Sequence, residues 1–205
     1  MKKLYIVFFF ITSIVDAQNV WMQRANLTGA ARHFAVGFSI GSKGYLGTGL
    51  SYSGTTLHKD FWEYNPTSNV WTQKADFGGN PKDNAIAFSI GAFGYIGTGY
   101  ESASTKGTSD FWEYDPTNNI WTQKADFAGT PRKFAVGLSI GNKGYIGLGL
   151  DTGNIVKHDF WEFNPANNSW TQKSNFPGSI ILYAVGFSIG SKGYLGTGMD
   201  TTYNQ

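Results

Sequence analysis

Hydrophobic and polar positions alternate most clearly over residues 84–90, where large and small side chains take turns along Asn-Ala-Ile-Ala-Phe-Ser-Ile. A period of two predicts a β-strand. Three more strands are predicted after it, at 95–99, 110–114 and 121–124. The connections are a tight glycine turn, a ten-residue loop and a turn with one Pro and two Asn, at 91–94, 100–109 and 115–119. Four short strands joined in this way predict one antiparallel sheet.

The same pattern returns along almost the whole chain. Each copy is opened by a tryptophan, and Trp21, Trp71, Trp121 and Trp170 lie 50, 50 and 49 residues apart. Every full copy contains Phe-Ser-Ile-Gly or Leu-Ser-Ile-Gly, then Gly-Tyr-Leu/Ile-Gly-x-Gly, Asp-Phe-Trp-Glu and Trp-Thr-Gln-Lys. A period near 50 with short aromatic segments predicts a repeat fold in which no unit buries its own apolar face.

Four antiparallel strands with aromatic residues on both faces predict a sheet that packs between two like sheets, which is a propeller blade. Residues 18–205 would then hold about three and a half four-stranded blades. Their expected bounds are 33–74, 83–124, 133–173 and an incomplete blade at 182–205, with a further strand at 21–24. The first strand of each copy has a face of Ala, Gly and Ser, so it is expected to be innermost, where strands crowd around an axis.

The repeat resembles the kelch repeat over residues 21–199. The Tyr before Gly-x-Gly and the Trp nine residues after the third-strand Trp match the kelch pattern. The repeat positions are Tyr45, Tyr95, Tyr145, Tyr194, Trp62, Trp71, Trp112, Trp121, Trp161, Trp170, Gly47, Gly49, Gly97, Gly99, Gly147 and Gly149. Kelch proteins place Gly where this chain has Thr48, Thr98, Leu148 and Thr197. The resemblance implies an all-β, kelch-type β-propeller of the superfamily that includes galactose oxidase. A WD40 propeller fits less well because its period is about 40–45 residues.

The strand count leaves the ring open. Fifteen strands are expected, because the last copy lacks its third and fourth strands before Gln205. The resemblance implies a ring of about six or seven blades, closed by pairing terminal strands, so the strand at 21–24 would join the last blade. The chain is therefore expected to be the N-terminal part of a longer protein. The alternatives are a compact four-bladed ring and an arc that closes by oligomerisation through exposed strand edges.

The first 17 residues differ from the repeat. Lys2 and Lys3 precede an apolar run at 4–15 and the small residue Ala17, which is typical of a secretory signal peptide. The run is short for a membrane span, and a buried first strand is the alternative. The mature protein is expected to be secreted, periplasmic or at the cell surface. Because the chain contains no Cys, neither disulfides nor a lipid anchor on cysteine is expected.

Charge and residue types exclude several function classes. The formal net charge of +2 gives little attraction for a polyanion, so nucleic acid is not an expected partner. The three histidines, His33, His58 and His158, have no metal-ligand spacing, and no Ser-His-Asp set is identifiable. No cofactor, metal site or catalytic residue is therefore assigned.

The loops vary between copies on one face of the predicted propeller, which is where binding residues are expected. Two sets of loop positions are candidates: one precedes the first strand of each copy and the other follows Gly-x-Gly. The candidate ligand-binding residues are Arg32, His33, Lys82, Asp83, Arg132, Lys133, Tyr183, Glu101, Asp151 and Asp200. The basic and aromatic ones suit a carboxylate or a sugar, and the acids suit a cation. The alternative is that they are solvated loop charges.

Two acidic positions recur in every full copy: Asp60, Asp110 and Asp159, and Glu63, Glu113 and Glu162. An active site is needed once per ring, so recurrence in each blade indicates structure. The Asp is expected to fix a loop and the Glu to bridge blades.

The sequence therefore favours a non-catalytic binding or interaction module that presents its variable loop face to a protein or a glycan. One alternative is a carbohydrate-active enzyme of the sialic-acid mutarotase type, which the kelch resemblance implies and the basic loop residues suit. The copper chemistry of galactose oxidase is not supported, because the resemblance implies a cross-linked Cys that this chain lacks. The other alternative is a surface protein that self-associates through its strand edges.

Overall fold

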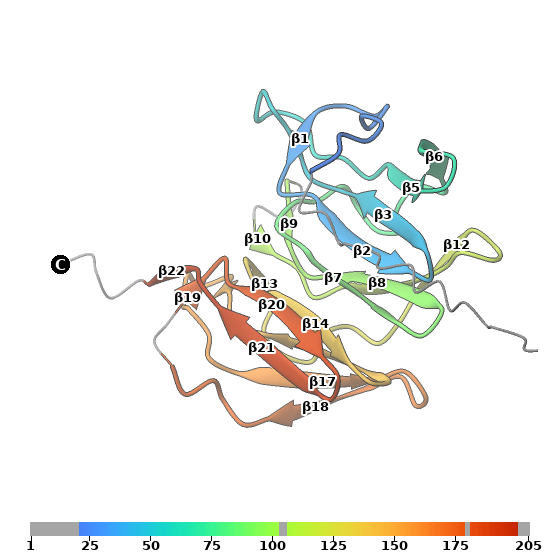
Figure 1. Cartoon of the computed structure of the whole chain (residues 1–205). Coiled ribbons are helices and arrows are strands. Elements are labelled where there is room, and N and C mark those ends of the chain that lie inside the picture. The colour runs from blue at the N-terminus through green and yellow to red at the C-terminus, as the bar shows by residue number, and fades with distance from the viewer. Residues whose placement is uncertain (1–20, 103–105, 179–180, 201–205) are drawn as a thin grey trace, which may run out of the picture.

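The computed structural model describes residues 21–102, 106–178 and 181–200. The described residues form strands and loops and no helix, so none of them forms a helix that could cross a membrane. Three four-stranded antiparallel sheets and the two-stranded sheet of residues 185–189 and 192–196 follow one another around an arc (Figure 1). We call these sheets blades 1 to 4. The signal peptide predicted at residues 1–17 lies outside the described residues.

Each full blade consists of four consecutive main strands. Blade 1 contains β2 (Val36–Ile40), β3 (Lys43–Gly47), β5 (Phe61–Asn65) and β6 (Val70–Lys74). Blade 2 contains β7 (Ile86–Ile90), β8 (Phe93–Gly97), β11 (Phe111–Asp115) and β12 (Ile120–Gln123). Blade 3 contains β14 (Val136–Ile140), β15 (Lys143–Gly147), β17 (Phe160–Asn164) and β18 (Ser169–Lys173). Blade 4 contains β20 (Val185–Ile189) and β21 (Lys192–Gly196).

Neighbouring blades contact one another through their innermost strands, β2, β7, β14 and β20. The small residues on one face of these strands predicted that they would be innermost. A methyl group placed on Gly137 of β14 would lie 2.8 Å from Cβ of Ile86 in β7. Placed on Gly186 of β20, it would lie 2.6 Å from Cγ2 of Val136. Contacts this short show that the absence of a side chain lets neighbouring blades approach.

Aromatic side chains fill the space between blades. Phe61 of blade 1 lies against Tyr114 and Trp121 of blade 2, with ring centroids 4.8 and 5.0 Å apart. The same contact recurs one blade later, where Phe111 lies 4.8 Å from Phe163 and 5.0 Å from Trp170. Each blade thus completes its core only with the next blade, which is how repeat folds gain stability.

Short strands extend the loops that were predicted to be irregular. They form the pairs β1 (Arg32–His33) with β4 (Leu50–Ser51), β9 (Tyr100–Glu101) with β10 (Lys106–Gly107), β13 (Arg132–Lys133) with β16 (Leu150–Asp151), and β19 (Ile181–Leu182) with β22 (Met199–Asp200). Arg132 is paired with Asp151 and Ile181 with Asp200. The two candidate loop positions of a copy are therefore backbone neighbours.

The strand predicted at 21–24 does not form. Residues 21–27 have no strand structure, and Trp21 is fully exposed. Instead Ala25 N–H donates to Oδ1 of Asn69 over 2.9 Å, and Nε1 of Trp71 donates to the Ala25 carbonyl over 3.0 Å. The segment is thus attached to the outer edge of blade 1. A fourth strand needs a third strand beside it, and the described part of blade 4 has two strands.

The residues between the glycines of Gly-x-Gly have a backbone conformation that favours glycine. Thr48, Thr98, Leu148 and Thr197 have φ of 57°, 55°, 58° and 60°. This left-handed region is unfavourable for residues with a Cβ atom. Threonine and leucine occupy these positions although glycine would adopt this backbone conformation more easily.

Candidate functional site

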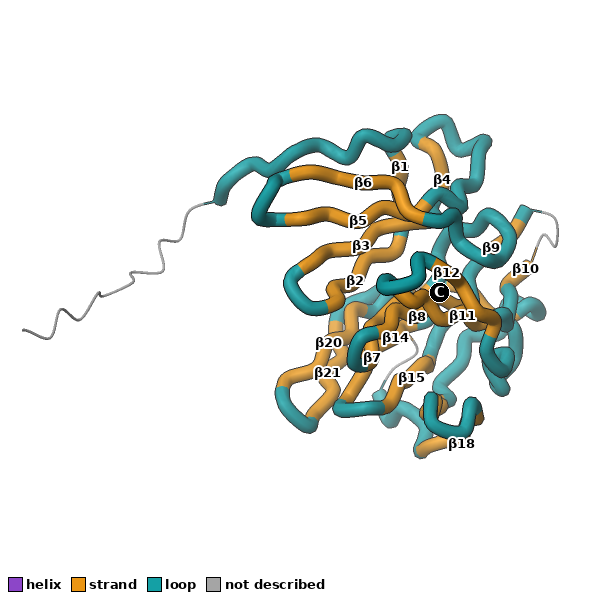
Figure 2. Tube along the Cα trace, turned by 90° about the vertical axis from the view of Figure 1, so that its right-hand side faces the viewer, coloured by secondary structure: helices purple, strands orange, loops and turns teal. Residues whose placement is uncertain are grey.

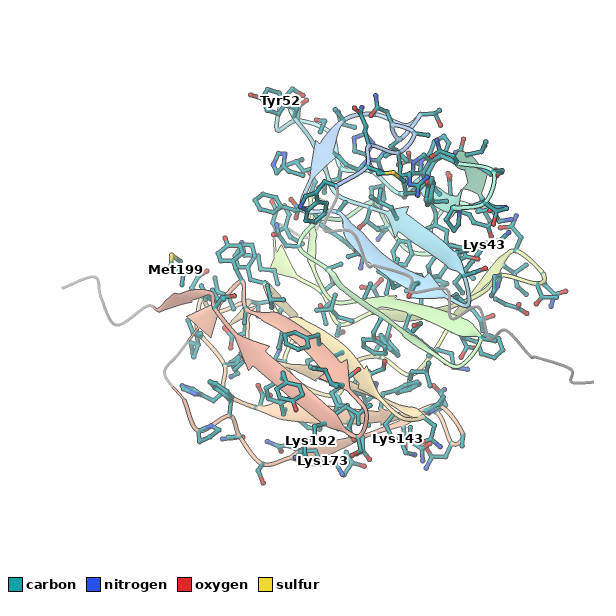
Figure 3. The ribbon with its side chains drawn as sticks, viewed as in Figure 1. Lys43, Tyr52, Lys143, Lys173, Lys192 and Met199 are labelled. Atoms are coloured by element: carbon teal, nitrogen blue, oxygen red, sulfur yellow. The ribbon has the colours of Figure 1, made fainter. Side chains whose placement is uncertain are left out.

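The loops that vary between copies and the short turns within each blade lie at opposite ends of the blades. We call these two ends the loop face and the turn face. Tyr52 and Met199 follow the Gly-x-Gly segments and lie at the left of the molecule in Figure 3, whereas Lys43 and Lys143 begin the second strand of their blades and lie further right. In Figure 2 the turn between β2 and β3 lies at the left of the molecule, whereas β4, β9 and β10 lie at the right.

Three basic residues among the predicted ligand residues have buried side chains within the loop face. Nη1 and Nη2 of Arg32 donate to Oδ1 and Oδ2 of Asp60, each over 2.6 Å. Arg132 makes the same two-pronged pair with Asp159, over 2.7 and 2.9 Å. In blade 2, Lys82 pairs with Asp110 and, over 3.1 Å, with Glu101. The side chains of Arg132 and Lys82 are wholly buried, so Arg32, Lys82 and Arg132 hold loops together and are not on the surface for a ligand.

The recurring Asp has the structural role that was predicted. Asp60, Asp110 and Asp159 each also accept a hydrogen bond from the indole Nε1 two residues later, over 2.7, 2.9 and 2.7 Å. Burial alone would raise the pKa of Asp60 and Asp159. Hydrogen bonds from the Arg and Trp partners outweigh it and lower the pKa of both carboxyls. Both therefore stay ionised within their pairs.

The recurring Glu acts within a blade, so the prediction of an inter-blade partner is wrong. Tyr45 donates to Oε2 of Glu63 over 2.8 Å, and the two residues are opposite one another on β3 and β5. Tyr145 makes the same bond to Glu162 over 2.7 Å. Burial and this bond raise the pKa of Tyr145 to about 12. The pairs form because Tyr and Glu occupy directly opposed positions in the ladder.

The exposed part of the loop face converges at the axis of the arc. Four residues that lie two positions before the innermost strands line a cavity of about 220 Å³, together with the alanine that follows each of them: Phe34, Asn84, Phe134 and Tyr183. All four have positive φ, of 56°, 51°, 59° and 60°. We call this cavity and the four residues the axial mouth. Phe34 and Tyr183 are about half exposed, and the Phe134 and Tyr183 rings lie 4.3 Å apart.

Backbone bonds hold the axial mouth in place. Asn84 N–H donates to the Phe34 carbonyl and Phe134 N–H donates to the Asn84 carbonyl, each over 3.3 Å. The mouth residues of three blades are thus joined to each other directly. A bulky residue in the left-handed region costs about 1–3 kcal/mol and persists only where its surroundings enforce it.

Three of the predicted residues flank this mouth. His33 lies 4.5 Å from Phe34, ring to ring, and Nζ of Lys133 lies 4.9 Å from the Phe134 ring and 5.1 Å from the Tyr100 ring. Asp83 is buried, and its Oδ1 atom has no hydrogen-bond partner. Burial raises the pKa of the Asp83 carboxyl. A hydrogen bond that the carboxyl accepts from Asn84, and electrostatic attraction to Lys133 and His33, offset this only in part.

Two of the acidic positions after Gly-x-Gly, Asp151 and Glu101, have ion-pair partners within the chain. Asp151 accepts the N–H groups of Gly153 and Ile155 over 2.8 and 2.9 Å and pairs with Lys157. Glu101 faces Lys82. For Asp200 only the backbone belongs to the described part. Among the described residues no group of three or more His, Asp or Glu side chains is arranged to hold a metal ion.

The prediction included Tyr183 and missed Phe34, Asn84 and Phe134. All four occupy the same position of the repeat, so aligning the four copies places them together. The aligned sequences do not show that this position surrounds the axis, because that depends on how the blades are arranged in space.

Comparison with known proteins supports the fold. No family model and no curated protein sequence matches the chain. Among solved structures, the one titled "Structure of YjhT" is similar with a TM-score of 0.70 and 17% sequence identity. The match covers 80% of this chain and 56% of that protein, so this chain spans little more than half of its length. Together with the sheet order and the repeat, this likeness identifies an all-β fold: a partial, kelch-type β-propeller.

Proposed function

We propose that this chain is a kelch-repeat binding module, non-catalytic and exported, which presents its loop face to a glycan or a protein. The observation that supports it most is the axial mouth, where Phe34, Phe134 and Tyr183 surround a cavity together with the amide of Asn84. Apolar rings beside a few polar groups are the usual composition of ligand sites. A scaffold that repeats from blade to blade, with loops that differ at one end, is a common arrangement for a binding site.

The chemistry of the mouth favours a sugar residue. The apolar face of a sugar ring can lie on an aromatic side chain while its hydroxyl groups bond to the amide of Asn84. Lys133 adds one positive charge beside the mouth, held over the rings of Phe134 and Tyr100. A glycan with a carboxylate is the ligand that uses all of these groups.

Two alternatives have weaker support. The mutarotase hypothesis relied on basic loop residues, and Arg32, Lys82 and Arg132 are paired with partly buried carboxylates. Self-association has one observation in its favour, because Phe187 and Ile189 of β20 are exposed. Sedimentation of the protein over a range of concentrations tests it, and a monomer at every concentration would exclude it.

A glycan array followed by titration tests the proposed function. Tyr183→Ala and Phe134→Ala are expected to weaken binding of any retained glycan at least tenfold while the fold persists, because both rings line the cavity. Phe93→Ala is the matched control, since Phe93 is a partly exposed aromatic at the turn between β7 and β8 on the opposite face. Equal loss in all three variants, or binding that ignores Tyr183 and Phe134, would contradict an axial site.

Export is a separate part of the proposal. N-terminal sequencing of the protein recovered outside the cytoplasm is expected to begin at Gln18, directly after the predicted cleavage site at Ala17. A mature protein that still begins at Met1 would contradict it.

A further inference from the structure

The third and fourth strands of each full blade complete the core of the blade before it. In blade 3, Phe163 of β17 and Trp170 of β18 lie 4.8 and 5.0 Å from Phe111 of blade 2, ring to ring. Trp170 also lies 5.2 Å from Phe127, which follows blade 2 in the chain. Blade 2 completes the core of blade 1 with the same contacts. Two aromatic rings from the next blade are therefore part of the core of blades 1 and 2.

Blade 3 has a cavity at the place that these rings would occupy. In the described part of the chain, blade 4 consists of β20 and β21, which lie beside blade 3 (Figure 1). Phe111 and Phe127 of blade 2 are 0% and 3% exposed, whereas their equivalents in blade 3, Phe160 and Phe176, are only partly buried. Between the two blades lies a cavity of about 340 Å³, and its lining includes Leu138, Tyr145, Phe160, Phe176 and Tyr194.

The glycine that ends the second strand of a blade shows where a third strand would lie. A methyl group placed on Gly47, Gly97 or Gly147 would lie 2.6, 2.5 or 2.5 Å from Cδ2 of the phenylalanine that the next strand places opposite it. Placed on Gly196 of β21, it has no described atom within 4 Å. The space that a phenylalanine ring fills in three blades is thus open beside β21.

The polar groups of β21 match those that hold a third strand in blade 1. β21 has the same five residues as β3, Lys-Gly-Tyr-Leu-Gly. In blade 1, Nζ of Lys43 donates to Oε1 of Glu63 over 2.6 Å, and the Tyr45 hydroxyl donates to Oε2 over 2.8 Å. The corresponding Lys192 and Tyr194 have no carboxylate partner among the described residues. The unpaired edge of β21 therefore suits a strand with the pattern Phe-Trp-Glu-Tyr.

We propose that this edge and the adjoining cavity, together the blade 4 groove, bind a β-hairpin of the same pattern from a partner protein. Its first strand pairs with β21, its Glu contacts Lys192 and Tyr194, and its aromatic rings contact Phe160 and Phe176. Phe-Trp-Glu followed by Tyr or Phe occurs three times in this chain, and each copy already forms the third strand of its own blade. The groove shares no lining residue with the axial mouth, so the proposal is independent of the glycan site.

The β5–β6 hairpin of this chain is the probe, because its natural neighbour β3 has the sequence of β21. A peptide of residues 59–74, acetylated and amidated at its ends, is added to the ¹⁵N-labelled whole chain. At saturation, with one peptide per chain, amide hydrogen exchange in β21 is expected to slow at least about tenfold. Exchange in β3, which already has a strand on each side, should not change. No slowing in β21 at about 1 mM peptide would overturn the proposal.

Two control peptides test whether the groove recognises the pattern. Tyr64→Ser removes the ring that is expected to enter the cavity, and this peptide should bind at least about tenfold more weakly. The peptide of reversed sequence has the same composition without the register of Glu and aromatic residues, and the same loss is expected. Equal binding of either control would mean that the groove is merely adhesive, and the proposal would be wrong.

The unlabelled whole chain, added in place of the peptide, tests a second copy as the occupant. It is expected to leave exchange in β21 unchanged, because its own hairpins are held within their blades. Slowing equal to that caused by the peptide at the same concentration would show that a second copy covers the groove, and the assignment to a partner protein would fail.

Gly196→Leu is the decisive variant, because it fills the place of the incoming phenylalanine without touching the free chain. It is expected to melt at or above the temperature of the parent chain, since a strand gains from a side chain where it had glycine. Its affinity for the 59–74 peptide should fall at least about tenfold. Ser191→Leu adds the same side chain in the exposed turn before β21 and should bind like the parent chain. Equal affinity of the Gly196 variant and the parent chain would exclude the blade 4 groove.

Discussion

At the scale of single residues, most charged groups that the repeat displays are structural. The recurrence of Asp60, Asp110 and Asp159 correctly indicated structure, and Arg32 and Arg132 recur with the same period. The sequence could not show that these two sets meet, since the partners of each pair lie 27 or 28 positions apart in the chain. Arg32 and Arg132 lie in β1 and β13, whereas Asp60 and Asp159 directly precede β5 and β17, so only the folded blade brings the partners together.

Arg132→Ala is expected to destabilise the chain by about 3–5 kcal/mol, because it leaves the partly buried Asp159 carboxylate without its arginine partner. Urea denaturation followed by tryptophan fluorescence measures this. Lys192→Ala, at an exposed position, should change the free energy of unfolding by less than about 0.5 kcal/mol. Equal effects of the two substitutions would mean that the ion pair contributes nothing to stability.

Asp83 has the opposite dependence on pH from the paired aspartates. Because burial raises the pKa of its carboxyl above the ordinary value of 3.8, ionisation is less favourable in the folded chain than in the unfolded chain. Its contribution to stability is therefore fully present below pH 3.8 and is lost as the pH rises through the folded pKa. Asp83→Asn is expected to stabilise the chain at pH 7, with a gain that shrinks toward zero as the pH falls below 3.8.

Denaturation curves at pH 3 and pH 7 would measure this difference. Asp76→Asn, which removes one charge from an exposed position, is the matched control. A gain for Asp83→Asn of the same size at both pH values would show that shape or hydrogen bonding, and not ionisation of Asp83, is responsible.

At the scale of elements, the main strands of blades 1 to 3 and their order could be predicted, whereas their ends and the short strands of the loops could not. The strand predicted at 84–90 begins at Ile86, because Asn84 has a φ of 51° that no strand accepts. The strand predicted at 95–99 ends at Gly97, because Thr98 and Gly99 also have positive φ. Alternation of side chains is the same on either side of such residues, so the pattern alone does not locate them.

Trp121 shows what an outer strand contributes to the neighbouring blade. Its ring lies 5.0 Å from Phe61 and 5.1 Å from Phe77, and its Nε1 atom donates to the Ala75 carbonyl. Trp121→Ala is expected to cost about 3–5 kcal/mol, as is usual for a large aromatic residue in a core. Trp21→Ala is the matched control because Trp21 has the same place in the repeat and is fully exposed. Thermal melting compares the two, and similar shifts would contradict the inter-blade packing.

At the scale of the whole molecule, the period of the repeat predicted the arc of blades, and the loops determine what the arc can bind. The one polar side chain of the axial mouth arises from a departure from the repeat. Asn84 stands among three aromatic residues, and Lys82 stands between two arginines in the series. Packing repeats the residues that every blade needs, so differences between copies are found where packing does not dictate the residue. A difference between copies indicates a binding site only where the residue lines a cavity, and the sequence does not show which residues do.

The arc also predicts a gradient of local stability. The side chains of Ile86, Phe88 and Ile90 in β7 are almost wholly buried between blades 2 and 3. The equivalent residues of β20, Val185, Phe187 and Ile189, are 58%, 52% and 63% exposed. In a repeat fold stability is approximately the sum of the units and their interfaces, so β20 should open far more often than β7.

Amide hydrogen exchange is expected to be fastest in β20 and β21 and slowest in β8 and β11. Equal protection of β7 and β20 that disappears on dilution would instead indicate that a second copy covers the β20 face in solution.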